Sequence, residues 1–163
     1  PSIGGGGRIA FVSDRDDGHT LQVYTMNPDG SDVRQITFGP GQKTQPKWSP
    51  DGAKIAFVSN QEGNKDIYVM NADGSNPHNI TNNSADEFDP AWMPDQTRFV
   101  FTSDRISQLR QVFIMDIDCE SGETCATGKP RNLSAGLQSS IHPPGRRPAC
   151  SRFPGCRRIT PSP

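Results

Sequence analysis

The sequence lacks long hydrophobic runs: its longest apolar stretches comprise only four or five residues. A membrane-spanning helix needs ~20 consecutive apolar residues, so no membrane insertion is expected. No signal-peptide hydrophobic region precedes Arg8. Because the chain opens abruptly at Pro1 and runs into four glycines, a leader or an earlier domain would lie outside this sequence, and the missing leader leaves the compartment open.

Catalytic signatures are also missing. The chain has no GxSxG elbow, no HExxH pair and no phosphate-binding glycine loop. The three histidines, His19, His78 and His142, are scattered over two turns and the C-terminal segment, which is typical of solvated surface groups. We therefore expect no enzyme activity, no cofactor and no metal site.

Acidic residues are absent from the last 29 positions. Residues 1–134 carry 12 basic and 18 acidic groups, a net charge of −6, whereas 135–163 carry five arginines and no acid. An acidic body argues against a nucleic-acid partner. The basic, proline-rich segment 135–163 is expected to be poorly ordered, either as a frame-shifted extension or as a genuine disordered tail.

The four cysteines form two pairs of equal spacing, and neither pair has the CxxC spacing of zinc sites. Cys119 and Cys125 flank one predicted hairpin loop, so they can reach disulfide distance; free thiols are the alternative. A bridge there would indicate an oxidising compartment. Cys150 and Cys156 fall in the tail and are given no structural interpretation.

What the chain does contain is an internal repeat. Trp48-Ser-Pro-Asp-Gly and the strand-like Lys54–Ser59 return 44 residues later as Trp92-Met-Pro-Asp and Arg98–Ser103. A period of ~40–45 residues with several short strands per unit is typical of a β-propeller blade. The sequence therefore predicts an all-β fold, a partial β-propeller of about three four-stranded antiparallel blades over residues 8–134, after a glycine-rich segment 1–7.

The second repeat specifies each strand. Residues 45–49 are interrupted by Pro46, which a strand tolerates only at an end or edge. Strands 54–59 and 66–70 are apolar on both faces and need cover on both, and 77–81 reads as a solvated outer strand. The Asn71-Ala-Asp-Gly turn carries alternating acids, but its glycine is misplaced for a calcium loop, so turn chemistry is favoured.

Four segments recur in order: Trp-Ser-Pro-Asp-Gly, Ser-Asp-Arg, Ile-Tyr-Val-Met-Asn-x-Asp-Gly and Asn-Ile-Thr. This unit resembles the blades of TolB-like, tricorn-type β-propellers across residues 8–134. The resemblance implies a periplasmic or extracellular binding protein, since TolB binds the lipoprotein Pal at the mouth of its channel. Similar propellers also serve as non-catalytic domains of peptidases and hydrolases.

Three departures from the repeat stand out. Blade three has Gln96 where the turn favours glycine, and it lengthens its outer hairpin through the cysteine pair. The first blade begins at Arg8 with its second strand, so it is expected to lack an innermost strand. Three blades cannot close a ring, so the chain is either part of a six- to eight-bladed protein or self-associates to complete one.

Propeller topology gathers the loops between strands two and three, and those between blades, on one face. We expect eight polar residues to form a rim there that binds a protein or peptide through charge-assisted hydrogen bonds. These residues are Asp14, Arg15, Lys43, Asn60, Asp86, Glu87, Asp104 and Arg105. The alternative is that each Asp-Arg couple closes its own turn.

The sequence thus favours a non-catalytic protein- or peptide-binding propeller module acting outside the cytoplasm. Two alternatives stay open: an accessory propeller domain of a larger peptidase or hydrolase, and a truncated fragment with no independent activity.

Overall fold

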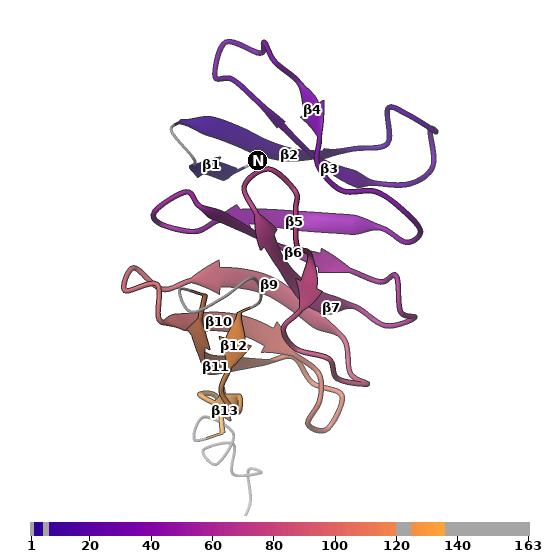
Figure 1. The fold of residues 1–163 in the computed structure, drawn as a ribbon. Helices are drawn as coiled ribbons and strands as arrows, with labels where there is room; N and C mark the ends of the chain where they lie inside the picture. Colours follow the sequence, from indigo (N-terminus) through magenta and orange to yellow (C-terminus); the bar gives the residue numbers. More distant parts are fainter. Residues whose placement is uncertain (1, 5–6, 120–124, 136–163) are drawn as a thin grey trace, which may run out of the picture.

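The computed structural model describes residues 2–4, 7–119 and 125–135, which form three antiparallel sheets stacked on one another (Figure 1). We call these sheets blades 1, 2 and 3. Blade 1 comprises β1 (Ser2–Gly4), β2 (Arg8–Ser13), β3 (Gln22–Met26) and β4 (Arg34–Gln35). Blade 2 comprises β5 (Lys43–Trp48), β6 (Lys54–Ser59), β7 (Asp66–Asn71) and β8 (His78–Asn79). Blade 3 comprises β9 (Glu87–Trp92), β10 (Arg98–Ser103), β11 (Gln111–Asp118), β12 (Ala126–Thr127) and β13 (Arg131–Asn132).

Blade 2 is covered on both faces, as its unbroken apolar strands predict. In β6, Ile55 and Phe57 point toward blade 1, whereas Ala56 and Val58 point toward blade 3. All four side chains are at most 2% exposed. Two hydrophobic cores therefore exist, one on each side of blade 2, and each needs residues from two neighbouring blades.

A stacked aromatic pair recurs in every blade. Phe57 lies 5.6 Å from Tyr68 between ring centroids. The equivalent pairs are Phe11 with Tyr24 at 5.7 Å and Phe101 with Phe113 at 5.8 Å. These rings join the second strand of each blade to the third, since offset stacking adds roughly 1 kcal/mol to area burial.

The turn between β5 and β6 follows its sequence chemistry. The amide of Gly52 donates to the carbonyl of Ser49 at 2.9 Å, and Gly52 adopts a φ of 74°, which glycine tolerates best. The Asn-x-Asp-Gly turn after β7 is also held by hydrogen bonds among its own residues, because Asp73 accepts from both the amide and the hydroxyl of Ser75. Asp73 thus stabilises the turn.

The first blade has an innermost strand, so the expectation that it lacks one is wrong. β1 pairs antiparallel with β2, with Ile3 opposite Ile9. The strand spans only three residues and ends at the first of the glycines. A segment this short and glycine-rich has too few side chains to show the alternation that identifies strands in a sequence.

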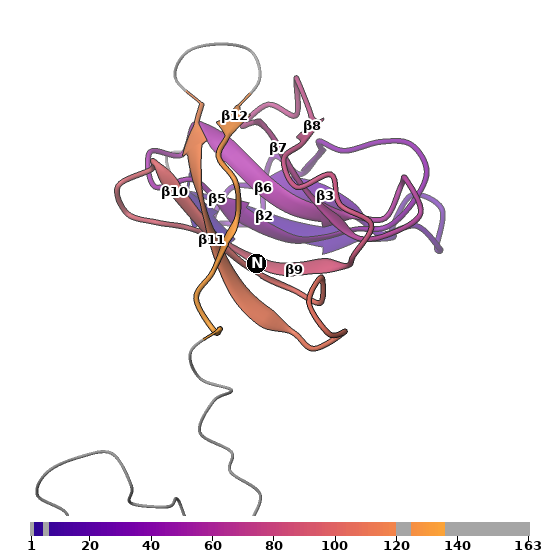
Figure 2. The same cartoon turned by 90° about the horizontal axis from the view of Figure 1, so that it is seen from below.

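Blade 3 departs from the other two at its outer edge. Both β12 and β13 pair with β11, β12 at its end and β13 near its start. A disulfide joins Cys119 to Cys125 across the hairpin. In Figure 2, β12 lies beside the end of β11.

Innermost strands β5 and β9 each contain a bulge. The pairing register shifts between Thr44 and Lys47 in β5, where Gln45 has a φ of 54°. The equivalent Asp89 in β9 has a φ of 52°. Pro46 and Pro90 follow directly, so each bulge accommodates a residue that cannot donate to the strand ladder.

The tail assigned to 135–163 lies outside the described residues apart from Ala135, as do Cys150, Cys156 and His142. Among the residues that are described, no helix is long and apolar enough to cross a membrane.

Candidate functional site

The candidate site is the face that carries the loops after the second strand of each blade and the connections between blades. It lies at the Ser13, Ser59 and Ser103 ends of β2, β6 and β10. We call this face the rim. The structure places all eight predicted residues at or just beneath it, but it gives them very different exposure.

Lys43 is not part of the exposed rim. It begins β5 and is 2% exposed. Its ammonium group donates to the carbonyl oxygens of Gly39, Pro40 and Gly41, the loop that precedes it. Burial lowers the pKa of the Lys43 ammonium. The residue stabilises the loop from beneath.

Glu87 is likewise buried, with no exposed surface at the start of β9. One oxygen accepts a hydrogen bond from the Ser103 hydroxyl at 2.9 Å and forms an ion pair with Arg105 at 2.7 Å. Phe101 and Phe113, on which Arg105 lies, face blade 2, so this ion pair belongs to the contact between blades 2 and 3. The prediction that Lys43 and Glu87 are surface rim residues is therefore wrong: the inner strands begin two residues earlier than the sequence suggested, and these side chains turn inward.

Asn60 and Asp104 close the connections between strands. The Asn60 side-chain oxygen accepts from the amide of Gln42 at 2.7 Å. Asp104 accepts from the amide of Asp86 at 2.9 Å in the same position of blade 3. Asp86 itself accepts from the Lys65 amide at 2.9 Å. All three side chains hold loops together, and all remain partly exposed.

Neither Arg15 nor Arg105 pairs with the aspartate before it among the described ion pairs. Each guanidinium instead donates from Nε to the hydroxyl of a preceding serine, Ser13 or Ser103, and lies over the aromatic pair of its blade. The Arg15 guanidinium carbon is 4.9 Å from the Tyr24 ring centre. Arg15 is exposed, and so is Asp14, whose carbonyl oxygen rather than its carboxylate closes the turn through Gly18.

Burial dominates the titration of the tyrosines beneath the rim. It raises the pKa of Tyr68 to about 12, with Glu62 adding to the shift. Burial also raises the pKa of Tyr24, with a smaller contribution from Asp16. Both phenols therefore remain neutral at physiological pH and act as packing groups.

The structure adds one exposed residue that sequence analysis missed. Phe38 is 71% exposed, the largest exposure among the large apolar side chains that are described. Its loop is held by Lys43 and by Gln22, whose amide donates to the Gly39 carbonyl at 3.0 Å. The repeat could have indicated that Phe38 is exposed, because the equivalent position of the next repeat is the polar Asn82.

The Phe38 loop is connected to the loop that carries Asp14 and Arg15. Gln42 accepts a hydrogen bond from the Leu21 amide at 2.6 Å and donates to the His19 carbonyl at 3.1 Å. These two bonds tie residues 38–42 to residues 14–21. An exposed aromatic ring and two exposed charges of opposite sign are thereby carried on two loops that are fixed to each other.

A cavity of about 410 Å³ lies on the innermost strands, around the two bulges. It is lined by Val12, Gln45, Pro46, Lys47, Asp89, Pro90 and Ala91. The Asp89 amide donates to the Gln45 side chain at 2.7 Å, which joins blade 3 to blade 2 on this side. The cavity thus lies on the side of the molecule where the first strands of successive blades, β1, β5 and β9, are neighbours.

Antiparallel blades stacked face to face, with their first strands on one side, define a partial β-propeller. A family model described as "TolB beta propeller domain" matches residues 39–145, more than half of the chain. The chain therefore belongs to the TolB β-propeller domain family.

Similar proteins agree with this assignment. A protein TolB homolog of Chlorobium luteolum is 37% identical over 59 residues, which are 36% of this chain and 12% of that protein. The uncharacterized peptidase YuxL of Bacillus subtilis is 42% identical over 59 residues, 36% of this chain and 9% of the peptidase. The structure of putative TolB from Agrobacterium tumefaciens superposes with a TM-score of 0.63 and 25% identity, over 79% of this chain and 48% of that one. The match thus spans only about a tenth of those two relatives and about half of the solved structure.

Proposed function

We propose that this chain is a non-catalytic module that binds a protein or peptide at the rim. The observation that carries the proposal is the exposed Phe38, held on a fixed loop beside the exposed Asp14 and Arg15. Covering an exposed aromatic side chain with a partner lowers the free energy of the complex, and a loop that is already held in place loses little entropy on binding. Charges of both signs beside it suit a polypeptide.

Asp14 and Arg15 are the rim charges in direct contact with the ligand. Asn60, Asp86, Asp104 and Arg105 are partly exposed and border the binding surface. Lys43 and Glu87 act from beneath, by fixing the loop and the blade contact. Relatives named "Tol-Pal system protein TolB" favour a protein partner, since the name places them in a multi-protein system.

The module acts outside the cytoplasm, in the periplasm or beyond the cell. The Cys119–Cys125 disulfide supports this location, because such bonds persist in oxidising compartments. The Tol-Pal relatives support it too, through the resemblance described above.

Peptide selection tests the rim proposal. A random dodecapeptide phage library is panned against the immobilised full chain, and the affinity of one selected peptide is measured by fluorescence anisotropy. Phe38→Ser and Arg15→Ala are each expected to weaken binding about tenfold or more. The matched control is Val33→Ser, which removes another exposed apolar side chain, 41% exposed, near the opposite end of blade 1. Equal affinity for Phe38→Ser and the parent chain would refute the proposal.

A second candidate is an accessory domain of a larger peptidase, which the 42% identity to YuxL favours. The rim would then guide substrate peptides toward a catalytic domain elsewhere in the protein. Extending the coding sequence in frame tests this idea, and a following hydrolase domain would support it.

A further inference from the structure

The two end blades each turn one face away from blade 2. Blade 1 and blade 3 lie at opposite ends of the stack, with blade 2 between them (Figure 1). Within the part of the chain that the structure describes, no further sheet packs against either outer face. The rim proposal makes no use of these two faces.

Both blade contacts inside the chain follow one pattern. Between blades 1 and 2, Phe57 of blade 2 shares a core with Ala10 and Val23 of blade 1. Between blades 2 and 3, Phe101 of blade 3 shares a core with Val58 of blade 2. In each contact, the face that carries the stacked ring pair of one blade covers an aliphatic face of the blade before it. Every blade thus has an aromatic face and an aliphatic face on opposite sides of its sheet.

The outer face of blade 1 is its aromatic face. Ala10 points toward blade 2, so its neighbours Ile9 and Phe11 point away from it, opposite Met26 and Tyr24 in the strand register. Ile9, Phe11 and Met26 are partly exposed. Their equivalents in blade 2 are at most 2% exposed: Ile55, Phe57 and Met70. The outer face of blade 1 therefore has the composition of a blade contact without the covering blade.

Tyr24 is buried on this face, at 3% exposed, beneath the Arg15 guanidinium. This arginine is compatible with blade packing. Arg105 lies in the same way over Phe113, 4.8 Å from the ring centre, within the contact between blades 2 and 3. A covering blade can therefore pack on the aromatic face of blade 1 while Arg15 stays in place.

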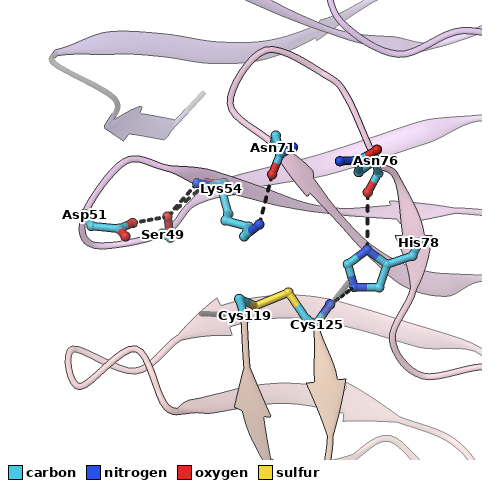
Figure 3. The surroundings of a disulfide bond; sticks show 8 residues. All are labelled: Ser49, Asp51, Lys54, Asn71, Asn76, His78, Cys119 and Cys125. Carbon is cyan, nitrogen blue, oxygen red and sulfur yellow. Dashed lines mark hydrogen bonds between the residues drawn. A yellow bond between two sulfur atoms is a disulfide. The ribbon is translucent and has the colours of Figure 1, made fainter. Parts of the chain in front are cut away.

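The inner face of blade 3 is already occupied by blade 2. The lengthened hairpin adds to this contact, since the Cys125 amide donates to His78 Nε2 of blade 2 at 2.7 Å beside the disulfide (Figure 3). The outer face is the aliphatic one, and it includes Val100 and Val112. Val112 is 37% exposed, whereas its equivalent in blade 2, Ile67, is fully buried.

Leu133 shows most clearly that a covering blade is missing. Its repeat equivalents are Ile36 in blade 1 and Ile80 in blade 2, and the amide of each donates to the third strand of its own blade. Ile36 and Ile80 are 7% and 6% exposed, because each belongs to the core shared with the following blade. Leu133 makes the same backbone bond, to Val112 at 2.8 Å, but is 47% exposed.

Charged residues lie only at the end of this face that is remote from the rim, among the strand residues described. There Arg98 is opposite Asp116. In blade 2 the equivalent Lys54 and Asn71 are opposite each other and stay partly exposed, although the rest of that face packs against blade 3. Polar side chains at this end are thus compatible with a blade contact.

We propose that two copies of this chain associate head to tail, so that blade 1 of each copy packs its aromatic face on the aliphatic face of blade 3 of the other. Both halves of this contact are present on one chain, but at opposite ends of the stack, and a second copy brings them together. Two such contacts join three blades to three, and six blades lie within the ~4–8 that close a propeller. The pair is therefore a closed ring with twofold symmetry rather than an open filament.

Sedimentation velocity of the full chain over a concentration series tests the association. The expected result is a species with twice the mass of one chain, which forms reversibly as the concentration rises. A single-copy mass at every concentration would overturn the proposal and would assign the cover of these faces to polypeptide outside this sequence. Growth into larger polymers would overturn it too, because it would show that the ring does not close.

Two variants test which faces meet. Leu133→Lys places a charge on the aliphatic face, and Ile9→Lys places one on the aromatic face. Each variant alone should associate at least about tenfold more weakly than the parent chain, because the contact would bury an unpaired charge. Either variant associating like the parent chain would contradict the head-to-tail contact, since a pair formed through two like faces needs only one of them.

An equal mixture of the two variants separates a lost contact from a lost fold. One contact in the mixed pair joins the unaltered blade 1 of the first variant to the unaltered blade 3 of the second, so part of the association should return. A mixture that associates no better than each variant alone would overturn the proposal. The control is Ile106→Lys, which adds the same charge at a residue that is 43% exposed in the loop after β10. It should associate like the parent chain. Because the rim is tested with its own selected peptide, either proposal can fail without the other.

Discussion

A β-carbon placed on Gly74 would lie 2.4 Å from the carbonyl oxygen of Ile36. Gly74 ends the turn after β7, and Ile36 follows β4 of the neighbouring blade. The backbones of blades 1 and 2 thus approach each other at a point where only glycine fits. Its repeat equivalent Gly30 has a similar φ, 85° against 90°, but nothing within 4 Å of such a carbon.

Gly74→Ala should therefore be more destabilising than Gly30→Ala. Positive φ costs each alanine ~1–2 kcal/mol, and the clash with Ile36 should add at least a further ~1 kcal/mol in the Gly74 variant. Urea unfolding of both variants measures the difference. Equal losses would mean that the two blades do not touch at this turn.

Arg105→Ala should cost roughly 3–5 kcal/mol of unfolding free energy. It would leave the fully buried Glu87 carboxylate without its cation, and removing one partner of a buried ion pair is strongly unfavourable. Arg15→Ala is the matched control, since Arg15 makes the same serine and aromatic contacts but is exposed. Its loss should be ~1 kcal/mol or less. Similar costs for the two variants would contradict the assignment of Glu87 to the blade contact.

Removing the disulfide should destabilise the chain by about 2 kcal/mol, because it closes a short loop of sequence separation 6. Cys119→Ser/Cys125→Ser should also loosen the hairpin that the disulfide closes and speed hydrogen exchange at the Cys125 amide, which donates to His78. Unchanged exchange at that amide would show that the hairpin is held without the bridge.

Stability should fall as the pH drops from about 4 toward 2. Hydrogen bonds from Thr20 and His19 lower the pKa of Asp17 from 3.8 to about 2. A carboxyl group with a lowered folded-state pKa stabilises the fold above its unfolded value, and this contribution disappears as the pH falls through the folded value. Asp17→Asn keeps the acceptor oxygen but does not titrate, so its urea midpoint should decrease less over this range. A midpoint that decreases as much as in the parent chain would be inconsistent with the assigned bonds.

The repeat predicted much of the fold. β6 spans Lys54–Ser59 as expected, and β7 ends one residue later than expected, at Asn71. Short-range chemistry is sufficient there, because apolar runs and glycine turns bound each strand. β1 was missed, since its glycine-rich segment has no pattern to recognise.

The site was harder to predict because exposure depends on neighbouring blades. The repeat places Lys43 and Glu87 near the rim, yet their burial depends on where β5 and β9 begin and on packing across blades. Asp116 illustrates the same limit. Its register partner can be inferred from the repeat, but the sequence does not reveal that Arg98 turns to Asp95 instead.

Site-specific photocrosslinking tests the central claim, that the rim is where this propeller binds polypeptide, most directly. A photoreactive benzoylphenylalanine replaces Phe38 in one chain and Val33 in another, and each is irradiated with the library-selected peptide. The account predicts a covalent adduct from position 38 and none from position 33, which lies near the far end of the same blade. An adduct from position 33, or none from position 38, would contradict it.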